Sequence, residues 1–266
     1  MHSSSCKTSF KIIRKLNIMI RLLVNFLEAL LNNFYRGRDR AFARFYVLET
    51  VARVPYFAFT SVLHLYETMG WWRKYDWLKV HFAESWNELH HLLIAESLGG
   101  NDHWYDRYLA RIGGLIYYWI IVLVYMINPR AAYNFMQQIE EHAYHTYDLF
   151  LKEHGEELKQ MPAPKVAINY YLDGDLYMFD EFQTTHPEAF RRPKIENLYD
   201  VFLAVREDEL EHVKTMIACQ QPEAQDTFQS PHTENRPVFP ESVRTAIELQ
   251  SAKIIQEAEK EPVELS

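Results

Sequence analysis

The chain has 266 residues, a net charge of −8 and an aromatic content of 15%. That length is enough for one large domain with a sizeable core, while the acidic balance argues against a nucleic-acid-binding protein, which needs a basic stripe. Cys6 and Cys219 lie far apart and outside any CxxC spacing, which argues against a disulfide framework and against a thiolate metal site.

The N-terminal segment, residues 1–40, is predicted to carry an amphipathic helix at 11–35. Basic side chains stand there among Ile, Leu, Val and Phe, a composition typical of a helix that lies in the interface of a membrane. These basic residues are Lys11, Arg14, Lys15 and Arg21. Residues 1–10 are rich in serine and free of acidic side chains, as targeting peptides are, but they are too few to identify one.

The rest of the chain is predicted to be all-α, because strand patterns are nearly absent and apolar residues recur at helical spacing. The breaks GRDR, MGWW, LGGN, NPR and MPAPK separate the expected helices. These helices cover residues 42–68, 74–98, 104–127, 130–158 and 196–219. Residues 41–220 are expected to form one bundle that includes an insertion at 161–195 with short helical turns. Residues 221–266 are expected to form a polar tail with a short surface helix at 241–259.

The longest apolar run, from Ile112 to Ile127, allows two interpretations. The first is a borderline membrane span, since as a helix the run would extend about 24 Å, which is short of the ~30 Å hydrocarbon core of a membrane. The alternative is the buried central helix of a bundle. This alternative is favoured because Arg111 and Arg130 close off the run at both ends.

Two glutamates are followed by a histidine three positions later: Glu88 by His91, and Glu209 by His212. Residues three apart share a helix face, so each Glu-x-x-His unit can present a carboxylate and an imidazole to one metal ion. The spacing alone is weak evidence, and its weight comes from the helices around it.

Di-iron carboxylate bundles need two further glutamates from two other helices, and the motifs FYVLETVARVP and QQIEEHAYHTY supply Glu49 and Glu140. Four carboxylates buried together would repel one another, whereas two divalent iron ions cancel their four negative charges. Oxygen donors with two imidazoles and no thiolate suit iron or manganese better than structural zinc. The sequence therefore predicts a ferritin-like di-iron four-helix bundle with additional helices.

Simpler roles stay open for single residues. Glu49 on its own would be expected to pair with Arg44 or Arg53, and only the four-part set favours a ligand role. Glu84 is expected to support the same helix face as Glu88 rather than to bind metal.

Five motifs between residues 44 and 220 resemble the alternative oxidase family, and within it the plastid terminal oxidase branch. They are RFYVLETVARVPYF, LHLYETMGWWR, HFAESWNELHHLLI, EEHAYHTYDLFLK and REDELEHVKTM. The segment APKVAINYYLDGDLYMFDEFQ followed by RRPKIENLYDVF is similar to the insertion that separates this branch from the mitochondrial one. The resemblance implies a plastoquinol:oxygen oxidoreductase that reduces dioxygen to water without pumping protons.

The resemblance also implies roles for single residues. The implied ligands of the two iron ions are Glu49, Glu88, His91, Glu140, Glu209 and His212. Tyr147, seven residues after Glu140, would be a redox-active tyrosine beside the iron ions, with a hydrogen-bonded core tyrosine as the simpler alternative. Asn87 and Asp208 are similar to family residues that orient the ligand imidazoles through hydrogen bonds.

For the quinol pocket, the resemblance points to Arg44, Leu48, Ala143 and Thr146. His142 stands where the mitochondrial motif LEEEA has a third glutamate, and this departure makes His142 a candidate proton acceptor for the quinol. Members of the family are monotopic, with helices in one membrane leaflet, and dimeric. The resemblance therefore implies a homodimer on one face of a thylakoid membrane.

Two other classes of protein stay open at this point. A di-iron monooxygenase or desaturase that acts on a membrane lipid or quinone would use the same ligands. The second class is a non-enzymatic iron store or a membrane-associated helical scaffold, although storage would need a surface that forms a cage.

Overall fold

The computed structural model describes residues 33–35, 40–71, 75–173, 193–221 and 240–261. These residues form helices joined by turns, and none of them lies in a strand, which confirms the predicted all-α class. The predicted interfacial helix at 11–35 lies outside the described residues except for its last three positions.

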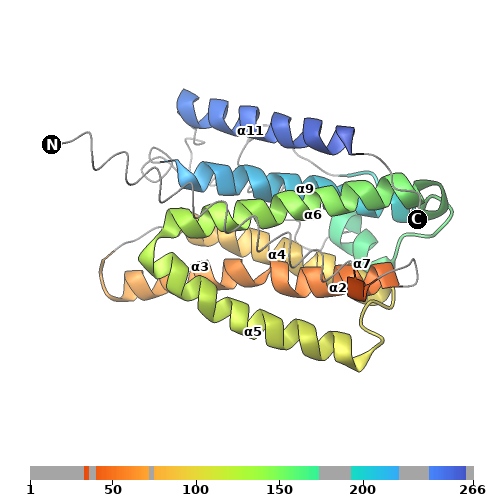
Figure 1. The fold of residues 1–266 in the computed structure, drawn as a ribbon, viewed down its shortest axis with the longest axis horizontal. Helices are drawn as coiled ribbons and strands as arrows, with labels where there is room; N and C mark the ends of the chain where they lie inside the picture. The colour runs from red at the N-terminus through yellow and green to blue at the C-terminus, as the bar shows by residue number, and fades with distance from the viewer. Residues whose placement is uncertain (1–32, 36–39, 72–74, 174–192, 222–239, 262–266) are drawn as a thin grey trace.

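Five helices build the central bundle shown in Figure 1. They are α2 (Ala41–Ala52), α3 (Val54–Thr68), α4 (Tyr75–Ser97), α6 (Pro129–Leu158) and α9 (Leu198–Gln220). The most extensive helix contact is between α6 and α9, while α4 packs against α2 and α3 and also contacts α9. Because α2 and α3 follow each other end to end, the five helices make a bundle with four arms.

The sequence predicted one helix over 42–68, and this prediction is wrong at Arg53, where the helix is interrupted. α2 ends at Ala52 and α3 begins at Val54. Pro55, the second residue of α3, has no N–H to donate to the carbonyl of Val51, and its ring crowds that carbonyl. The hydrogen-bond ladder therefore restarts between the two helices.

Local signals set the ends of the other bundle helices. Asn128 caps α6 by accepting a hydrogen bond from Ala131 N at 3.2 Å. Asn197 caps α9 in the same way, from Asp200 N at 3.1 Å. Gly99 follows α4 with a φ of 85°, a conformation that costs glycine little and stops the helix.

α11 (Glu241–Lys260) and α5 (Trp104–Ile127) lie on opposite sides of the bundle in Figure 1. The surface helix predicted at 241–259 is confirmed in position. Its apolar face, which includes Val243, Ile247 and Ile254, is buried in the same core cluster as Met216 of α9. This face therefore belongs to the core of the bundle.

α5 exposes most of its apolar side chains, so the interpretation of the run from Ile112 as a buried central helix is wrong. Only 22% of its most apolar 18-residue window is buried, because a narrow face with Ala110, Gly114 and Ile121 is enough to pack against the bundle. The exposed apolar side chains include Trp104, Tyr108, Leu109, Ile112, Leu115, Ile116, Trp119, Ile120, Leu123, Met126 and Ile127.

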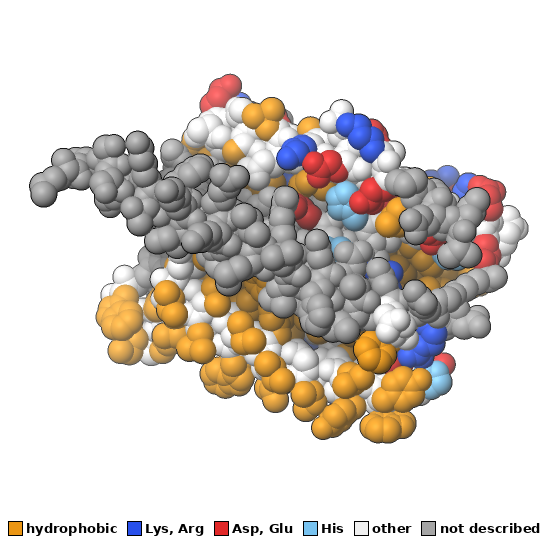
Figure 2. Space-filling model, viewed as in Figure 1, with side chains coloured by type: hydrophobic (Ala, Val, Ile, Leu, Met, Phe, Trp, Pro, Cys, Tyr) orange, Lys and Arg blue, Asp and Glu red, His pale blue; other side chains and the backbone are white. Residues whose placement is uncertain are grey.

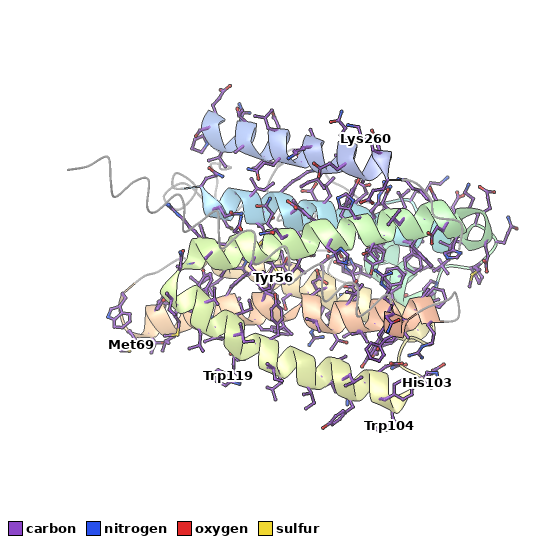
Figure 3. All side chains as sticks on the ribbon, viewed as in Figure 1. Tyr56, Met69, His103, Trp104, Trp119 and Lys260 are labelled. Atoms are coloured by element: carbon purple, nitrogen blue, oxygen red, sulfur yellow. The ribbon has the colours of Figure 1, made fainter. Side chains whose placement is uncertain are left out.

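These side chains form an apolar band along α5, seen in orange in Figure 2, and the labelled Trp104 and Trp119 lie on its outer side in Figure 3. The helix has 24 residues, so it extends about 36 Å. Within the described residues it is the one helix that is long and apolar enough to cross a membrane.

The described part of the predicted insertion contains a short helix, α7 (Lys165–Ile168), and a π-helical turn, η2 (Asn169–Asp173). The buried residues Tyr170 and Tyr171 of this turn pack into the second core cluster, together with residues of α2, α4 and α9. The turn therefore brings two tyrosine side chains from the insertion into the interior of the bundle.

Candidate metal centre

Six acidic and imidazole side chains meet inside the bundle, and none is more than 1% exposed. Each of the four arms contributes at least one, and the six are Glu49, Glu88, His91, Glu140, Glu209 and His212. They form two overlapping groups. Within each group the candidate ligand atoms lie within 4.8 Å of one another, so each group could hold one metal ion.

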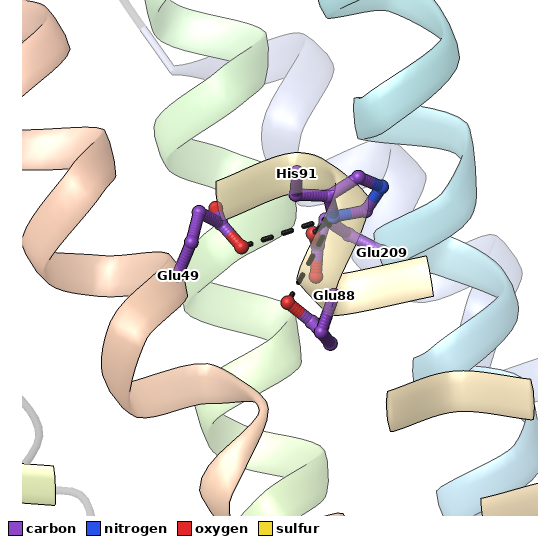
Figure 4. Close-up of side chains that lie close together, drawn as sticks. All are labelled: Glu49, Glu88, His91 and Glu209. Atoms are coloured by element: carbon purple, nitrogen blue, oxygen red, sulfur yellow. Dashed lines mark ion pairs between the residues drawn. The ribbon is translucent and has the colours of Figure 1, made fainter. Parts of the chain in front are cut away.

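The first group surrounds Nδ1 of His91, as Figure 4 shows. This atom lies 3.0 Å from Oε1 of Glu209 and 3.8 Å from Oε2 of both Glu49 and Glu88. Three helices, α2, α4 and α9, therefore supply one candidate ion site.

The second group surrounds Nδ1 of His212. This atom lies 2.9 Å from Oε1 of Glu88, 3.6 Å from Oε2 of Glu209 and 3.7 Å from Oε1 of Glu140. Glu88 and Glu209 thus turn one oxygen toward each imidazole, whereas Glu140 belongs to this group alone. A carboxylate that divides its oxygens in this way can bridge two ions.

The carboxylate oxygens of this centre are short of hydrogen-bond donors, which is the condition that a cation relieves. Among the described residues, no donor satisfies either oxygen of Glu88 or Glu209, or Oε2 of Glu49 and Glu140. Leaving so many buried acceptors without donors is costly. Two divalent cations would balance four carboxylate charges, so the residues present fit a dinuclear metal site.

The pKa values of the centre show how it accommodates its charge without metal. Burial, followed by the charges of neighbouring carboxylates, raises the pKa of Glu49 and of Glu140 well above the usual range. Burial also acts to raise the pKa of Glu209, but the adjacent imidazoles of His212 and His91 outweigh it and lower that pKa. Protons therefore neutralise part of the cluster where cations would do so in the loaded protein.

Asp208 holds the ring of His91 from the side opposite the cluster. Its Oδ2 lies 3.2 Å from Nε2 of His91, and it accepts hydrogen bonds from Tyr171 OH at 2.7 Å and Asn87 Nδ2 at 2.9 Å. A carboxylate on Nε2 keeps the proton there and leaves the lone pair of Nδ1 for a metal. Asn87 contacts His91 only indirectly, because its hydrogen bond goes to Asp208. Asn87 also donates to Tyr170 OH at 2.8 Å.

Tyr147, for which the family resemblance implied a place beside the iron ions, lies next to the centre. Its hydroxyl donates a hydrogen bond to Oε1 of Glu49, and its ring stacks on Phe45 with centroids 4.5 Å apart. Burial, and next the charge of Glu49, raise the pKa of Tyr147 well above its usual value. The phenol is therefore held neutral next to a candidate ligand, which both predicted roles require.

Tyr56 was not among the predicted site residues. Its hydroxyl donates to Oε1 of Glu140 at 2.5 Å. Glu49 and Glu140, the outer glutamates that each belong to only one ligand group, therefore each accept a hydrogen bond from one tyrosine. Tyr56 follows Glu49 by seven residues, the same spacing that separates Tyr147 from Glu140. In the single helix that the sequence predicts over 42–68, this spacing would have placed Tyr56 on the face of Glu49 and so marked it as a candidate.

The residues predicted to line a quinol pocket come from two helices that contact each other, α2 and α6. Arg44 and Leu48 are four residues apart on α2, and so share a face. On α6, Ala143 and Thr146 are buried, and Thr146 Oγ1 lies 3.4 Å from Nε2 of His142. Their role in binding a quinol stays a prediction.

Comparison with known proteins gives the family. The alternative oxidase family profile matches residues 1–221. Ubiquinol oxidase 4, chloroplastic/chromoplastic, of Arabidopsis thaliana is 62% identical over 196 residues, which are 74% of this chain and 55% of that protein. Ubiquinol oxidase 2, mitochondrial, of Nicotiana tabacum is 30% identical over 167 residues, which are 62% of this chain and 50% of that protein. The chain thus spans about half the length of these curated relatives.

The matched range, residues 1–221, contains all six residues of the candidate metal centre. Identity to the chloroplastic relative is about twice that to the mitochondrial one, in agreement with the resemblance of the insertion at 161–195. The chain therefore belongs to the alternative oxidase family, in its plastid terminal oxidase branch.

Proposed function

We propose that this protein is a plastoquinol:oxygen oxidoreductase. It takes electrons from two quinols, passes them to one dioxygen and releases water without pumping protons. The observation that carries this proposal is the pair of overlapping ligand groups inside a bundle of the alternative oxidase family. The Arabidopsis and tobacco relatives described above are both named ubiquinol oxidases.

Two iron ions are the proposed cofactor. Glu49 and His91 would hold one ion, Glu140 and His212 the other, with Glu88 and Glu209 shared between them. The donor set of carboxylates and imidazoles without thiolate suits iron. The ions would supply the binding of oxygen and the storage of electrons, which no side chain provides.

The protein's own groups keep this centre ordered and dry. Asp208 fixes the tautomer of His91, while Tyr56 and Tyr147 fix the outer glutamates by donating hydrogen bonds to them. The buried position of all ligands excludes bulk water. Tyr147 is in addition the proposed donor of an electron during oxygen reduction, because its hydroxyl contacts Glu49 directly.

The quinol head group would bind between α2 and α6, next to Tyr147. Arg44 and Leu48 would line one side, and Ala143 and Thr146 the other. His142 would accept a proton from the quinol hydroxyl, since its Nε2 lies near Thr146 Oγ1. Plastoquinol is favoured over ubiquinol because the insertion resembles that of the plastid branch, and because the Arabidopsis relative is named chloroplastic.

The exposed apolar band of α5 supports attachment to one leaflet of a thylakoid membrane, as a monotopic homodimer. A buried face and an exposed apolar face along the same helix suit a helix that lies in the membrane surface with its bundle outside. Quinol would then reach the bundle laterally from the lipid. The division into an N-terminal segment 1–40, an oxidase bundle 41–220 and a tail 221–266 is part of this proposal.

Oxygen uptake by the purified protein tests the function. With iron quantified, plastoquinol-dependent uptake that cyanide does not block is expected, with isotope-labelled oxygen appearing only in water. Label in an organic product would instead indicate a monooxygenase. Glu88→Ala and His212→Ala should abolish uptake and lower bound iron, whereas Glu153→Ala, on the outer face of α6, should do neither. Normal turnover with two irons in either ligand variant would reject the site.

A further inference from the structure

A second buried polar group lies in the bundle beyond the metal centre. Nε2 of His81 lies 2.9 Å from the hydroxyl of Tyr133, and Nδ1 of His81 lies 2.9 Å from Oε2 of Glu84. The hydroxyls of Tyr133 and Tyr125 are 2.7 Å apart. All four side chains are at most 1% exposed. Glu84, expected from the sequence to support the face of Glu88, thus instead supports an imidazole that binds a tyrosine.

The directions of these hydrogen bonds follow from the carboxylate, which only accepts. His81 donates from Nδ1 to Glu84, so its Nε2 accepts from the hydroxyl of Tyr133. Tyr133 in turn accepts from Tyr125. The result is a phenol whose proton points at a neutral imidazole nitrogen, with a carboxylate behind the imidazole to stabilise a positive charge.

This group stands at a fixed distance from the metal centre. His81 precedes Glu88 by seven residues on α4, and Tyr133 precedes Glu140 by seven residues on α6. Two helix turns correspond to about 10 Å, and residues seven apart share a face. Tyr133 therefore lies two turns before Glu140 on α6, whereas Tyr147 lies two turns after it.

Aromatic rings fill the space between the two groups. Tyr56, labelled in Figure 3, donates its hydroxyl to Glu140, and its ring centroid is 6.2 Å from that of His81. The ring of His81 lies 5.5 Å from that of Tyr133. Each step is a contact between neighbouring rings, which is short enough for an electron to pass.

Protons do not have the same route. Among the described residues, no hydrogen bond joins Tyr56 to His81, since they meet only through their rings. The proton of Tyr133 must therefore stay within its own group when an electron leaves. Burial raises the pKa of Tyr133 well above its usual value, so the phenolate does not form in advance.

We propose that Tyr133 is a second redox-active tyrosine of this protein, with His81 as its proton acceptor and Glu84 as the positioning residue for His81. One electron passes from Tyr133 to the oxygen-activated metal centre, and its O–H proton moves to Nε2 of His81. A neutral tyrosyl radical and an imidazolium result. One electron from quinol, with return of the same proton, restores the phenol. This step rests on the proposed function for its oxidant.

Electron paramagnetic resonance on the iron-loaded protein tests the proposal. The protein carries Tyr147→Phe, which removes the tyrosine next to Glu49, and ring-deuterated tyrosine, which identifies a tyrosyl signal. After reduction and mixing with oxygen without quinol, rapidly frozen samples should contain a tyrosyl radical. Adding Tyr133→Phe should abolish it. Adding His81→Gln should also abolish it, because glutamine can hold the hydroxyl but takes no proton.

The matched control is Tyr144→Phe, a buried tyrosine of the same helix outside this group. It should leave the radical in place, and iron content and melting temperature should agree across the variants. A radical that survives Tyr133→Phe, or no radical while iron is present and oxygen is consumed, overturns the proposal but leaves the oxidase function standing.

A separate measurement covers failure of the proposed function, which would appear as full iron with no oxygen consumed. Photogenerated tris(bipyridine)ruthenium(III) then replaces oxygen as the one-electron oxidant. The long-lived part of the tyrosyl signal should disappear with Tyr133→Phe and persist with Tyr144→Phe. An equal long-lived signal in both variants overturns the proposal.

Discussion

Replacing Asp208 with asparagine should weaken metal binding while the bundle stays folded. All three donors, His91 Nε2, Tyr171 OH and Asn87 Nδ2, converge on the same oxygen, Oδ2. The amide oxygen of an asparagine can occupy that position and accept from the same groups. What is lost is the negative charge behind the imidazole, which makes Nδ1 of His91 a better metal ligand.

The structure sets the size of the effect. Hydrogen bonds to a charged acceptor contribute about 1.5–3 kcal/mol and neutral ones about 0.5–1.5 kcal/mol, so each of the three bonds weakens by about 1 kcal/mol. For the metal, loss of such an outer partner lowers affinity by about 10- to 100-fold, or about 1.4–2.8 kcal/mol. Asp208→Ala is less informative. It would leave three buried donors without an acceptor at about 1–3 kcal/mol each, which is comparable with the whole stability of a domain.

Chelator competition, started from both the metal-loaded and the metal-free protein and followed until the two agree, measures this affinity. Urea unfolding of the metal-free protein measures the stability. The matched control is Asp200→Asn in the first turn of the same helix, which should leave metal affinity unchanged. Wild-type affinity in Asp208→Asn would refute the idea that this carboxylate tunes His91. So would an equal loss in Asp200→Asn.

Three further outcomes are expected. Tyr147→Phe should keep the metal and lose most of the turnover, measured as iron content and oxygen uptake; an unchanged rate would make Tyr147 a packing residue only. In the metal-free protein, stability should fall as pH rises above the usual glutamate pKa. The reason is that the raised pKa values of Glu49 and Glu140 make the folded state bind more protons than the unfolded chain. Urea unfolding from about pH 5 to about pH 8 should show this fall, and metal should remove it. Ile254→Ala should cost about 2–5 kcal/mol because Ile254 is buried against the core, whereas Leu249→Ala, 68% exposed, should change stability by less than about 0.5 kcal/mol.

The cluster of six side chains could be predicted because its strongest signals are local. Glu88 and His91 share a face of one helix whatever packs against it, and the same holds for Glu209 and His212. Matching the two units needs no knowledge of how the helices are aligned. The seven-residue spacing between Glu49 and Tyr56 is a local signal of the same kind.

Other features depend on how helices meet. His81 and Tyr133 are 52 positions apart, and their contact exists only because α4 and α6 bring them to the same level of the bundle. The direction in which α5 faces was equally hidden. Small residues such as Ala110 and Gly114 mark the buried face of α5, whereas its large apolar side chains lie on the exposed face, which is the opposite of what hydrophobicity alone predicts.

The six candidate ligands are deeply buried, and this affects how a metal ion would enter the protein. An ion in solution has no direct access to side chains that are at most 1% exposed, so insertion and loss must await moments when the helices part. Retention of iron would then be governed by how rarely the folded chain opens rather than by equilibrium affinity. The metal-loaded protein would release its ions slowly even to a strong chelator. Newly made chains would take up metal most easily before they finish folding.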